Sequence, residues 1–189
     1  MLDDTELLAA WRAGDAAAGE QLFARHFELV FRYFDRRVGA DADDLTQRTF
    51  LGLVESRERF QGNCPLRAFV LAIARKQLLM WFERKRKDTA VSFRTMSMVD
   101  LGQGATTQMF VDQQRQGLHD AMRRLPADLH TAVELYYFEE LSIRDIAVVL
   151  EAPEGTIKRW LWRARALLAE MLPAELRGTL EQHLAARGD

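Results

Sequence analysis

Basic and aromatic residues are interleaved in residues 154–168, which read EGTIKRWLWRARALL. Glu154, at the start, is the only acid in this segment. On a helix, at about 100° per residue, the apolar residues share one arc, while the bases and Trp162 share the other. Long basic side chains can bond DNA phosphates or the acceptor edge of guanine, and a helix start offers free N–H groups to a phosphate. We predict DNA contacts from these residues: Gly155, Thr156, Lys158, Arg159, Trp162, Arg163 and Arg165.

The same pattern also fits an amphipathic surface helix with solvated charges. What precedes the segment favours DNA recognition. SIRDIAVVL predicts a short helix in which Ser142 and Asp145 form a capping box, and EAPEG then interrupts it. Two short helices joined across a tight break are typical of a helix-turn-helix.

Charge is unevenly distributed along the chain. The net charge of −2, taken alone, argues against a nucleic-acid-binding protein. However, the acids gather in residues 3–6 and 41–44, whereas the bases gather in residues 84–87 and in residues 154–168. The neutral total therefore conceals two separate basic clusters.

Apolar residues recur at helical spacing along most of the chain, which predicts an all-α protein. Residues 3–39 indicate a helical hairpin, and Asp41 to Asp44 are expected to cap the helix that follows. Gly62 and Pro65 break the pattern, and Pro65 is suited to open the next helix. We expect two small helical domains, 1–88 and 118–173, joined by a flexible linker, 89–117, with a short helical extension, 174–189.

Several classes of protein are not indicated. No apolar run approaches the roughly 20 residues that cross a bilayer, and the first residues are acidic, so we expect a cytoplasmic protein without membrane insertion. The single cysteine, Cys64, excludes an intramolecular disulfide and stands in no metal-ligand cluster, and a redox role for it is a minor alternative. Common catalytic motifs are missing and the four histidines are scattered. We therefore expect no catalytic residue, metal or cofactor.

Two parts of the chain resemble one protein family. Residues 125–172 look like the promoter-binding C-terminal domain of bacterial RNA polymerase sigma factors of the sigma-70 family. Residues 41–79 are similar to the helices of that family that bind core polymerase and melt the promoter. The two domains with their linker resemble the compact extracytoplasmic-function (ECF) branch. The resemblance implies a sigma factor that directs promoter-specific initiation.

The resemblance also implies three sets of site residues. Residues implied to bind the clamp of the largest polymerase subunit are Asp43, Asp44, Leu45, Thr46, Gln47, Arg48, Phe50 and Leu51. Those implied to contact the downstream promoter element are Phe60, Gln61, Gly62, Asn63, Cys64, Phe69, Arg75, Lys76, Arg84, Lys85, Arg86 and Lys87. The cationic arc of residues 154–168 is implied to read the upstream element.

The partners that this family implies are core RNA polymerase, promoter DNA and an anti-sigma factor, with a monomeric chain when free. Two rivals remain open at this point. A stand-alone helix-turn-helix regulator shares the C-terminal pattern, but such proteins usually carry a sensor domain of alternating strands and helices. A helical adaptor that binds only protein would leave the basic faces as solvated surface.

Overall fold

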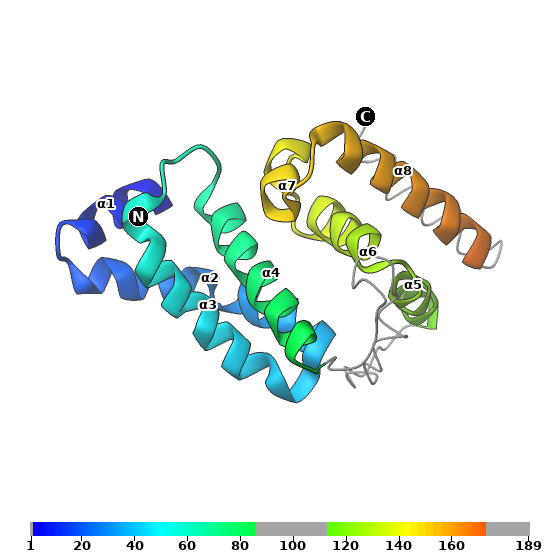
Figure 1. Cartoon of the computed structure of the whole chain (residues 1–189), viewed down its shortest axis with the longest axis horizontal. Coiled ribbons are helices and arrows are strands. Elements are labelled where there is room, and N and C mark those ends of the chain that lie inside the picture. Colours follow the sequence, from blue (N-terminus) through cyan, green and yellow to red (C-terminus); the bar gives the residue numbers. More distant parts are fainter. Residues whose placement is uncertain (1, 86–112, 173–189) are drawn as a thin grey trace. The chain divides into compact units, whose positions relative to one another are not determined.

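In the computed structural model, residues 2–85 and 113–172 are described, and within them all regular structure is helical (Figure 1). This confirms the all-α prediction. The chain divides into two compact units, Met1–Asp88 and Thr89–Asp189. Of the expected parts, most of the linker and the whole extension lie outside the described residues. None of the described helices is long and apolar enough to span a membrane.

Within residues 2–85, the first unit has four helices and two short 3₁₀ turns. These are α1 (Asp4–Arg12), α2 (Ala16–Val38), η1 (Gly39–Asp41), α3 (Ala42–Ser56), η2 (Arg57–Arg59) and α4 (Leu66–Lys85). The predicted hairpin is α1 and α2, and Asp15 caps α2 by accepting from the N–H groups of Ala17 and Ala18. The core between the helices includes fully buried Leu22, Phe34 and Leu53. Burial of each such side chain contributes roughly 1.5–3 kcal/mol to stability.

The start of α3 differs from its predicted cap. Asp41 occupies the N-cap position, but its side chain makes no capping hydrogen bond. Its Oδ2 instead accepts from Lys85 Nζ at 2.7 Å, and this bond ties the last turn of α4 to the start of α3. Asp43 and Asp44 lie in the first turn of α3, where acids interact favourably with the helix dipole.

The described residues of the second unit form four helices and one π-helical turn. These are α5 (Gln113–Arg123), α6 (Ala127–Val133), η4 (Glu134–Phe138), α7 (Ile143–Leu150) and α8 (Glu154–Met171). α5 begins inside the segment that we expected to be linker. The core of the second unit includes Leu135, Ile146 and Ile157, which are fully buried. α6 and α7 both pack against α8, so that α8 has one face fixed and the other free.

The turn between α7 and α8 matches the predicted helix-turn-helix break. Glu151 ends α7 in the left-handed region, at φ 50°, and the N–H of Ala152 donates to Ala147 O at 3.1 Å. At the other end of α7, Ser142 Oγ accepts from the N–H of Asp145 as predicted. The second half of the expected capping box differs, because Asp145 Oδ2 accepts from the Ser142 hydroxyl at 2.7 Å.

Candidate nucleic-acid and protein interfaces

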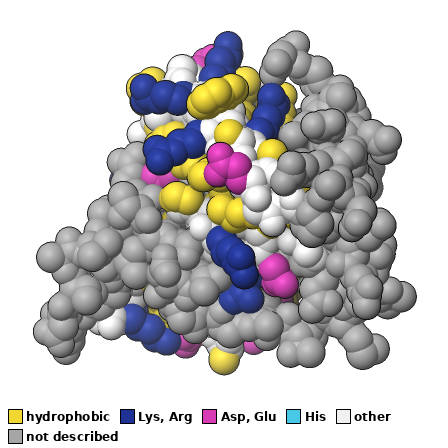
Figure 2. Space-filling model, turned by 90° about the vertical axis from the view of Figure 1, so that its right-hand side faces the viewer, with side chains coloured by type: hydrophobic (Ala, Val, Ile, Leu, Met, Phe, Trp, Pro, Cys, Tyr) yellow, Lys and Arg dark blue, Asp and Glu magenta, His cyan; other side chains and the backbone are white. Residues whose placement is uncertain are grey.

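The exposed face of α8 carries the predicted cationic arc. Ile157, Leu161, Ala164 and Leu168 are buried, which fixes the rotation of the helix about its axis. Lys158, Arg159, Trp162 and Arg163 are exposed on the other side, and Trp162 is 70% exposed. Figure 2 shows a face of the molecule on which Lys and Arg side chains lie among hydrophobic ones. A surface of bases with an aromatic ring can contact both phosphates and base edges.

Two predicted DNA contacts of α8 differ in the structure. Arg165 Nε donates to Tyr137 Oη at 2.7 Å, so this guanidinium is held against η4 instead of projecting with the other bases. The N–H of Thr156 donates to Pro153 O at 2.8 Å and is therefore not available to a phosphate. Glu154 adds a negative charge to the same turn, which disfavours a phosphate there.

The predicted downstream loop joins η2 to α4. Gln61, Gly62 and Asn63 are exposed at its tip, and Gly62 has φ 71°, a conformation that favours glycine. At its root, the ring of Phe60 lies 4.7 Å from the ring of Phe69. The structure thus brings together the two aromatic residues of the predicted set, beside an exposed polar tip.

The basic residues of α4 that were predicted to contact DNA separate into three groups. Lys76 and Arg84 are exposed, as a DNA contact requires. Arg75 is only 7% exposed; a buried guanidinium cannot reach a phosphate, and we omit Arg75 from the DNA surface. Lys85 is exposed but bonded to Asp41 and lies 4.3 Å from the ring centroid of Trp81. Arg86 and Lys87 lie outside the described residues.

Helical periodicity divides the predicted polymerase-binding residues between surface and core. Leu45 and Thr46 are 1% exposed and Phe50 is 9% exposed. Leu45 supports the surface from beneath, whereas Thr46 and Phe50 reach it only where they line a pocket. Asp43, Asp44, Gln47 and Leu51 are exposed. Arg48 forms an ion pair with Asp44 at 2.8 Å, one helical turn apart.

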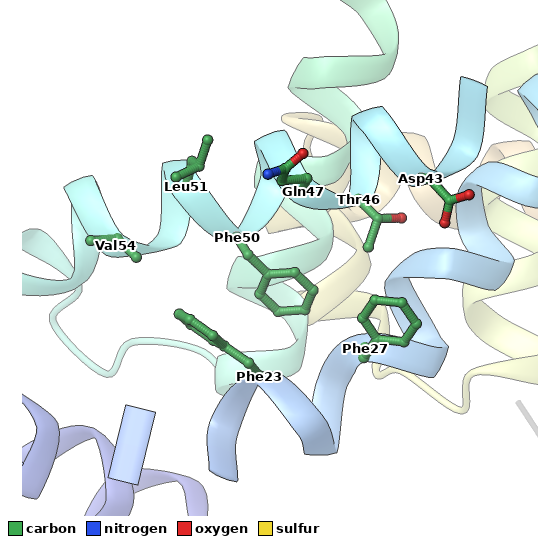
Figure 3. Close-up of a pocket in the computed structure, with 8 residues that line it drawn as sticks. All are labelled: Phe23, Phe27, Asp43, Thr46, Gln47, Phe50, Leu51 and Val54. Atoms are coloured by element: carbon green, nitrogen blue, oxygen red, sulfur yellow. The ribbon is translucent and has the colours of Figure 1, made fainter. Parts of the chain in front are cut away.

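An apolar pocket of about 360 Å³ lies between α2 and α3 (Figure 3). Phe27 stacks on Phe50 with ring centroids 6.4 Å apart, while 48% of Phe27 and 56% of Leu51 remain exposed. A partly open apolar pocket with a polar rim is suited to receive a protein side chain. The lining residues are Phe23, Phe27, Asp43, Thr46, Gln47, Phe50, Leu51 and Val54.

The two phenylalanines of α2 in this pocket were not among the predicted site residues. Phe23, Phe27 and Phe31 repeat every four residues, beside the buried row of Leu22, Val30 and Phe34. A second apolar row on a helix that already has a buried row was the available signal. Both rows fit the packing of a helical hairpin, so the pattern alone does not distinguish the pocket row from the core row.

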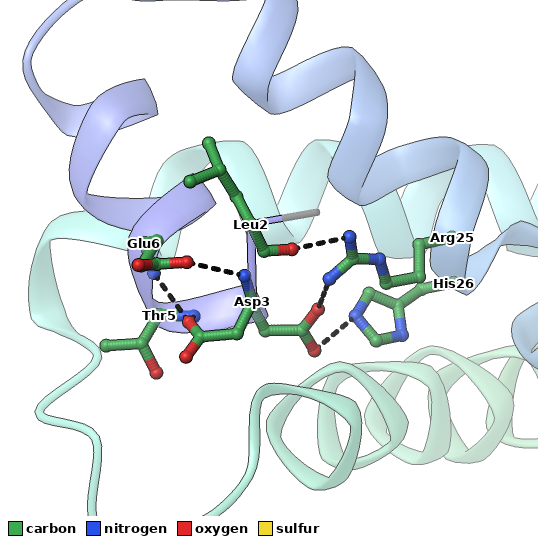
Figure 4. A network of polar contacts seen from close by, with 7 residues as sticks. Leu2, Asp3, Thr5, Glu6, Arg25 and His26 are labelled. Carbon is green, nitrogen blue, oxygen red and sulfur yellow. Dashed lines mark hydrogen bonds and ion pairs between the residues drawn. The ribbon is translucent and has the colours of Figure 1, made fainter.

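A polar network joins the start of the chain to α2 (Figure 4). Asp4 accepts from Arg25 Nη1 at 2.7 Å and lies 2.9 Å from His26 Nε2. His26 is 5% exposed. Burial lowers its pKa below the ordinary 6.5, and Arg25 and Arg67 act in the same direction against the opposing effect of Asp4. His26 is therefore a neutral imidazole near pH 7 that donates from Nε2 to Asp4.

Comparison with known families identifies both units. The sigma-70 region 2 model matches residues 22–88, and the sigma-70 region 4 model matches residues 115–168. The ECF RNA polymerase sigma factor BldN of Streptomyces coelicolor is 32% identical over 179 residues, which cover 91% of this chain and 67% of BldN. The chain belongs to the sigma-70 family.

A second relative places this sigma factor in the ECF branch. It is 32% identical over 172 residues to the ECF RNA polymerase sigma factor SigM of Mycobacterium tuberculosis, covering 89% of this chain and 84% of SigM. As an ECF sigma factor, the chain is a DNA-binding initiation factor that directs promoter-specific transcription. The region 2 match disfavours the stand-alone regulator, whose resemblance is confined to the C-terminal half.

Solved structures share the sigma fold. The sigma factor RpoE in complex with the anti-sigma factor NepR from Bartonella quintana aligns with a TM-score of 0.61 at 19% identity, covering 80% of this chain and 94% of RpoE. CnrH in complex with the cytosolic domain of CnrY aligns with a TM-score of 0.62 at 22% identity, covering 89% of this chain and 96% of CnrH. The region 2 match begins at residue 22, so α1 of this sigma factor precedes it.

Proposed function

We propose that three surfaces of this sigma factor have separate binding roles. α8 reads the upstream promoter element, the loop of residues 60–64 captures an unstacked base of the downstream element, and the pocket between α2 and α3 binds the polymerase clamp. The supporting observation is the exposed face of α8, where Lys158, Arg159 and Arg163 surround Trp162. A solvated surface helix gains nothing by exposing 70% of a tryptophan.

Base capture fits the chemistry of the downstream loop. An unstacked base is held by stacking on an aromatic ring and by hydrogen bonds to its edge. Phe60 and Phe69 supply the rings, and the exposed Gln61 and Asn63 supply donors and acceptors. Lys76 and Arg84 add charge for the phosphates. Holding the base out of the stack stabilises the melted strand.

Clamp binding fits the pocket between α2 and α3. Protein interfaces combine an apolar centre, which supplies most of the affinity, with a polar rim. Phe27 and Leu51 are the exposed apolar residues, and Asp43 and Gln47 stand on the rim. Leu51→Glu is therefore expected to lower affinity for core polymerase at least tenfold, because it buries a charge in the interface. Leu2→Glu, at another exposed leucine of the same unit, is the matched control.

We also propose an anti-sigma factor as a partner of this chain. One solved protein of the same fold, RpoE, is in complex with the anti-sigma factor NepR, and a second, CnrH, is in complex with the cytosolic domain of CnrY. We place the chain in the cytoplasm, where polymerase and the chromosome are found, as a monomer when free. Binding and positioning carry the function, without a chemical step by the chain itself.

Transcription by sigma-free core polymerase on fragmented genomic DNA, with and without this chain, tests the proposal. Start sites that need the chain and share two spaced elements are expected. Trp162→Ala should then lower the amount of transcript to a degree that depends on the sequence of the upstream element. Leu51→Glu should lower the amount of transcript at every start site. Protection of duplex DNA by the chain alone, without new start sites, would contradict the proposal and favour a stand-alone regulator.

A further inference from the structure

α1 is bonded directly to the root of the downstream loop. Arg12, the last residue of α1, directs its guanidinium at two backbone carbonyls of the first residues after α3. Nε donates to Arg57 O at 2.9 Å, and Nη2 donates to the same oxygen. Nη2 also donates to Phe60 O at 2.6 Å. One side chain therefore spans the turn η2 and ends on the first residue of the loop.

Neighbouring side chains reinforce this contact. The guanidinium of Arg57 lies over the ring of Trp11, 4.7 Å from the ring centroid. Glu58 accepts from Arg57 Nε at 3.2 Å, and its other oxygen lies 3.9 Å from Arg12 Nε. The Arg12 side chain is 31% exposed, and ion pairs at such exposure contribute little stability. The bonds from Arg12 to the two carbonyls are thus important for the orientation that they impose on the backbone, and not for the stability that they add.

α1 itself is firmly attached to α2. Trp11 packs edge-on against Phe23, with ring centroids 5.3 Å apart. The same indole lies against Gly19, where an added Cβ would come within 2.6 Å of Trp11 Nε1. At the opposite end of α1, Asp4 is bonded to Arg25 and His26. Because both ends of α1 are fixed, Arg12 projects from a rigid support.

The bond from Arg12 fixes the residue that begins the loop. The carbonyl of Phe60 is held by Arg12, and its ring is held by Phe69 on α4. The tip, Gln61 to Asn63, is exposed. The loop therefore has a backbone anchor and a ring anchor at the same residue, next to the groups that we propose to receive the base.

We propose that Arg12 is a positioning residue for promoter recognition, which sets the orientation of Phe60 and of the downstream loop through its bonds to two backbone carbonyls. The inference rests on the proposed role of residues 60–64. Arg12 lies outside the segment matched by the region 2 model. Base capture demands geometry within a fraction of an ångström, so a loosened root should cost discrimination between bases.

The experiment uses holoenzyme reconstituted with the full chain on a promoter mapped as above. Open-complex formation is measured on the native promoter and on single-base substitutions in its downstream and upstream elements. Arg12→Ala is expected to reduce downstream discrimination about tenfold while leaving upstream discrimination and core affinity unchanged. A lysine has no planar fork to bridge two carbonyls, so Arg12→Lys should lose downstream discrimination in the same way.

Arg124→Ala is the control, because it removes an exposed arginine from the turn after α5 in the second unit, which has no part in α1, the loop or any surface proposed above. It should preserve downstream discrimination. Retained discrimination in Arg12→Ala, or full recovery in Arg12→Lys, would overturn the proposal; the second result would indicate a charge effect. If the unsubstituted chain itself shows no downstream discrimination, the loop assignment fails together with the positioning role, and the two failures are thereby distinguished.

Discussion

Trp162 is the most exposed of the large hydrophobic side chains in the described residues. It stands one residue before Arg163 and three after Arg159, both exposed. In a major groove, such a ring can pack against the methyl group of thymine, while the neighbouring bases bond phosphates or guanine. Because the ring makes no part of the buried face of α8, its contribution to folding should be small.

Trp162→Ala is therefore expected to separate DNA recognition from stability. Holoenzyme affinity for the promoter should fall about tenfold or more, since one base contact is worth roughly 1–3 kcal/mol, and the thermal midpoint should stay unchanged. Trp162→Phe keeps a ring and should lose less. Electrophoretic mobility shift and calorimetry measure the two quantities; a lower midpoint with unchanged affinity would assign Trp162 to folding.

His26 predicts how stability varies with pH. Its pKa is lowered from 6.5, chiefly by burial, so at and below about pH 6.5 the unfolded chain binds more protons at His26 than the folded chain does. Well above pH 6.5 neither state is protonated, and there His26 contributes no pH dependence. The free energy of unfolding should decline as the pH falls below 6.5, by at most about 1.4 kcal/mol per pH unit from this residue.

Urea unfolding between pH 5 and pH 7.5 measures this slope. His26→Gln should reduce it, because glutamine does not titrate, while its amide can still donate to Asp4. Arg59→Gln removes an exposed arginine of the same unit that does not act on His26, and it is the control that should leave the slope unchanged. An identical slope in the His26→Gln variant would show that other groups account for the acid sensitivity.

Some roles of single residues lie beyond sequence reasoning. The cationic arc of α8 follows from helical periodicity, and the structure exposes Lys158, Arg159 and Arg163 on it. Arg165 does not project with them because Tyr137, 28 residues away, accepts from it. Arg75 is buried, although arginine is usually a surface residue. Both outcomes depend on neighbours that are distant in sequence, which a single-segment pattern does not contain.

At the level of the helices, close packing of α1 on α2 rests on one glycine. A Cβ at residue 19 would lie 2.6 Å from Trp11 Nε1, and Trp11 is 9% exposed, so the indole has little room to move. Gly19→Ala should destabilise the first unit by about 1–3 kcal/mol, the usual cost of overpacking. Helical content as a function of urea measures the change.

Two controls bear on the Gly19 result. Gly155, another helical glycine, has nothing within 4 Å of an added Cβ, so Gly155→Ala should be neutral or stabilising by up to about 1 kcal/mol. Combined with Trp11→Phe, a smaller ring, Gly19→Ala should cost less than it does alone. Equal costs at Gly19 and Gly155 would contradict the packing argument.

The positions of the helices along the chain were easier to predict than the contacts between them. The hairpin, the break at Pro65 and the helix-turn-helix follow from apolar spacing and from Gly and Pro, and all appear in the structure. The pocket did not follow, because Phe23 and Phe27 on α2 meet Phe50 on α3 only after the chain folds. The cap at Asp41 was wrong for a similar reason: Lys85, 44 residues away, takes its carboxylate.

The whole chain carries a net charge of −2, yet each unit has exposed bases that we propose to contact DNA. One unit offers a loop and the other a helix, and neither surface is large. When polymerase holds both on one promoter, binding of the second becomes intramolecular, and such linkage commonly raises affinity 10²–10⁴-fold. Unbound chain lacks that advantage and also repels DNA weakly through its acids.

The isolated chain is therefore expected to bind a promoter fragment at least about 100-fold more weakly than the holoenzyme does, and with little preference over a fragment whose two elements are scrambled. Fluorescence anisotropy at fixed ionic strength measures both affinities, since salt alone changes such values by orders of magnitude. Arg163→Glu should weaken the holoenzyme on the native fragment and leave the scrambled fragment less affected, because the charge it reverses lies on the reading face of α8. Tight, specific binding by the isolated chain would instead indicate that recognition is complete without polymerase, as in a stand-alone regulator.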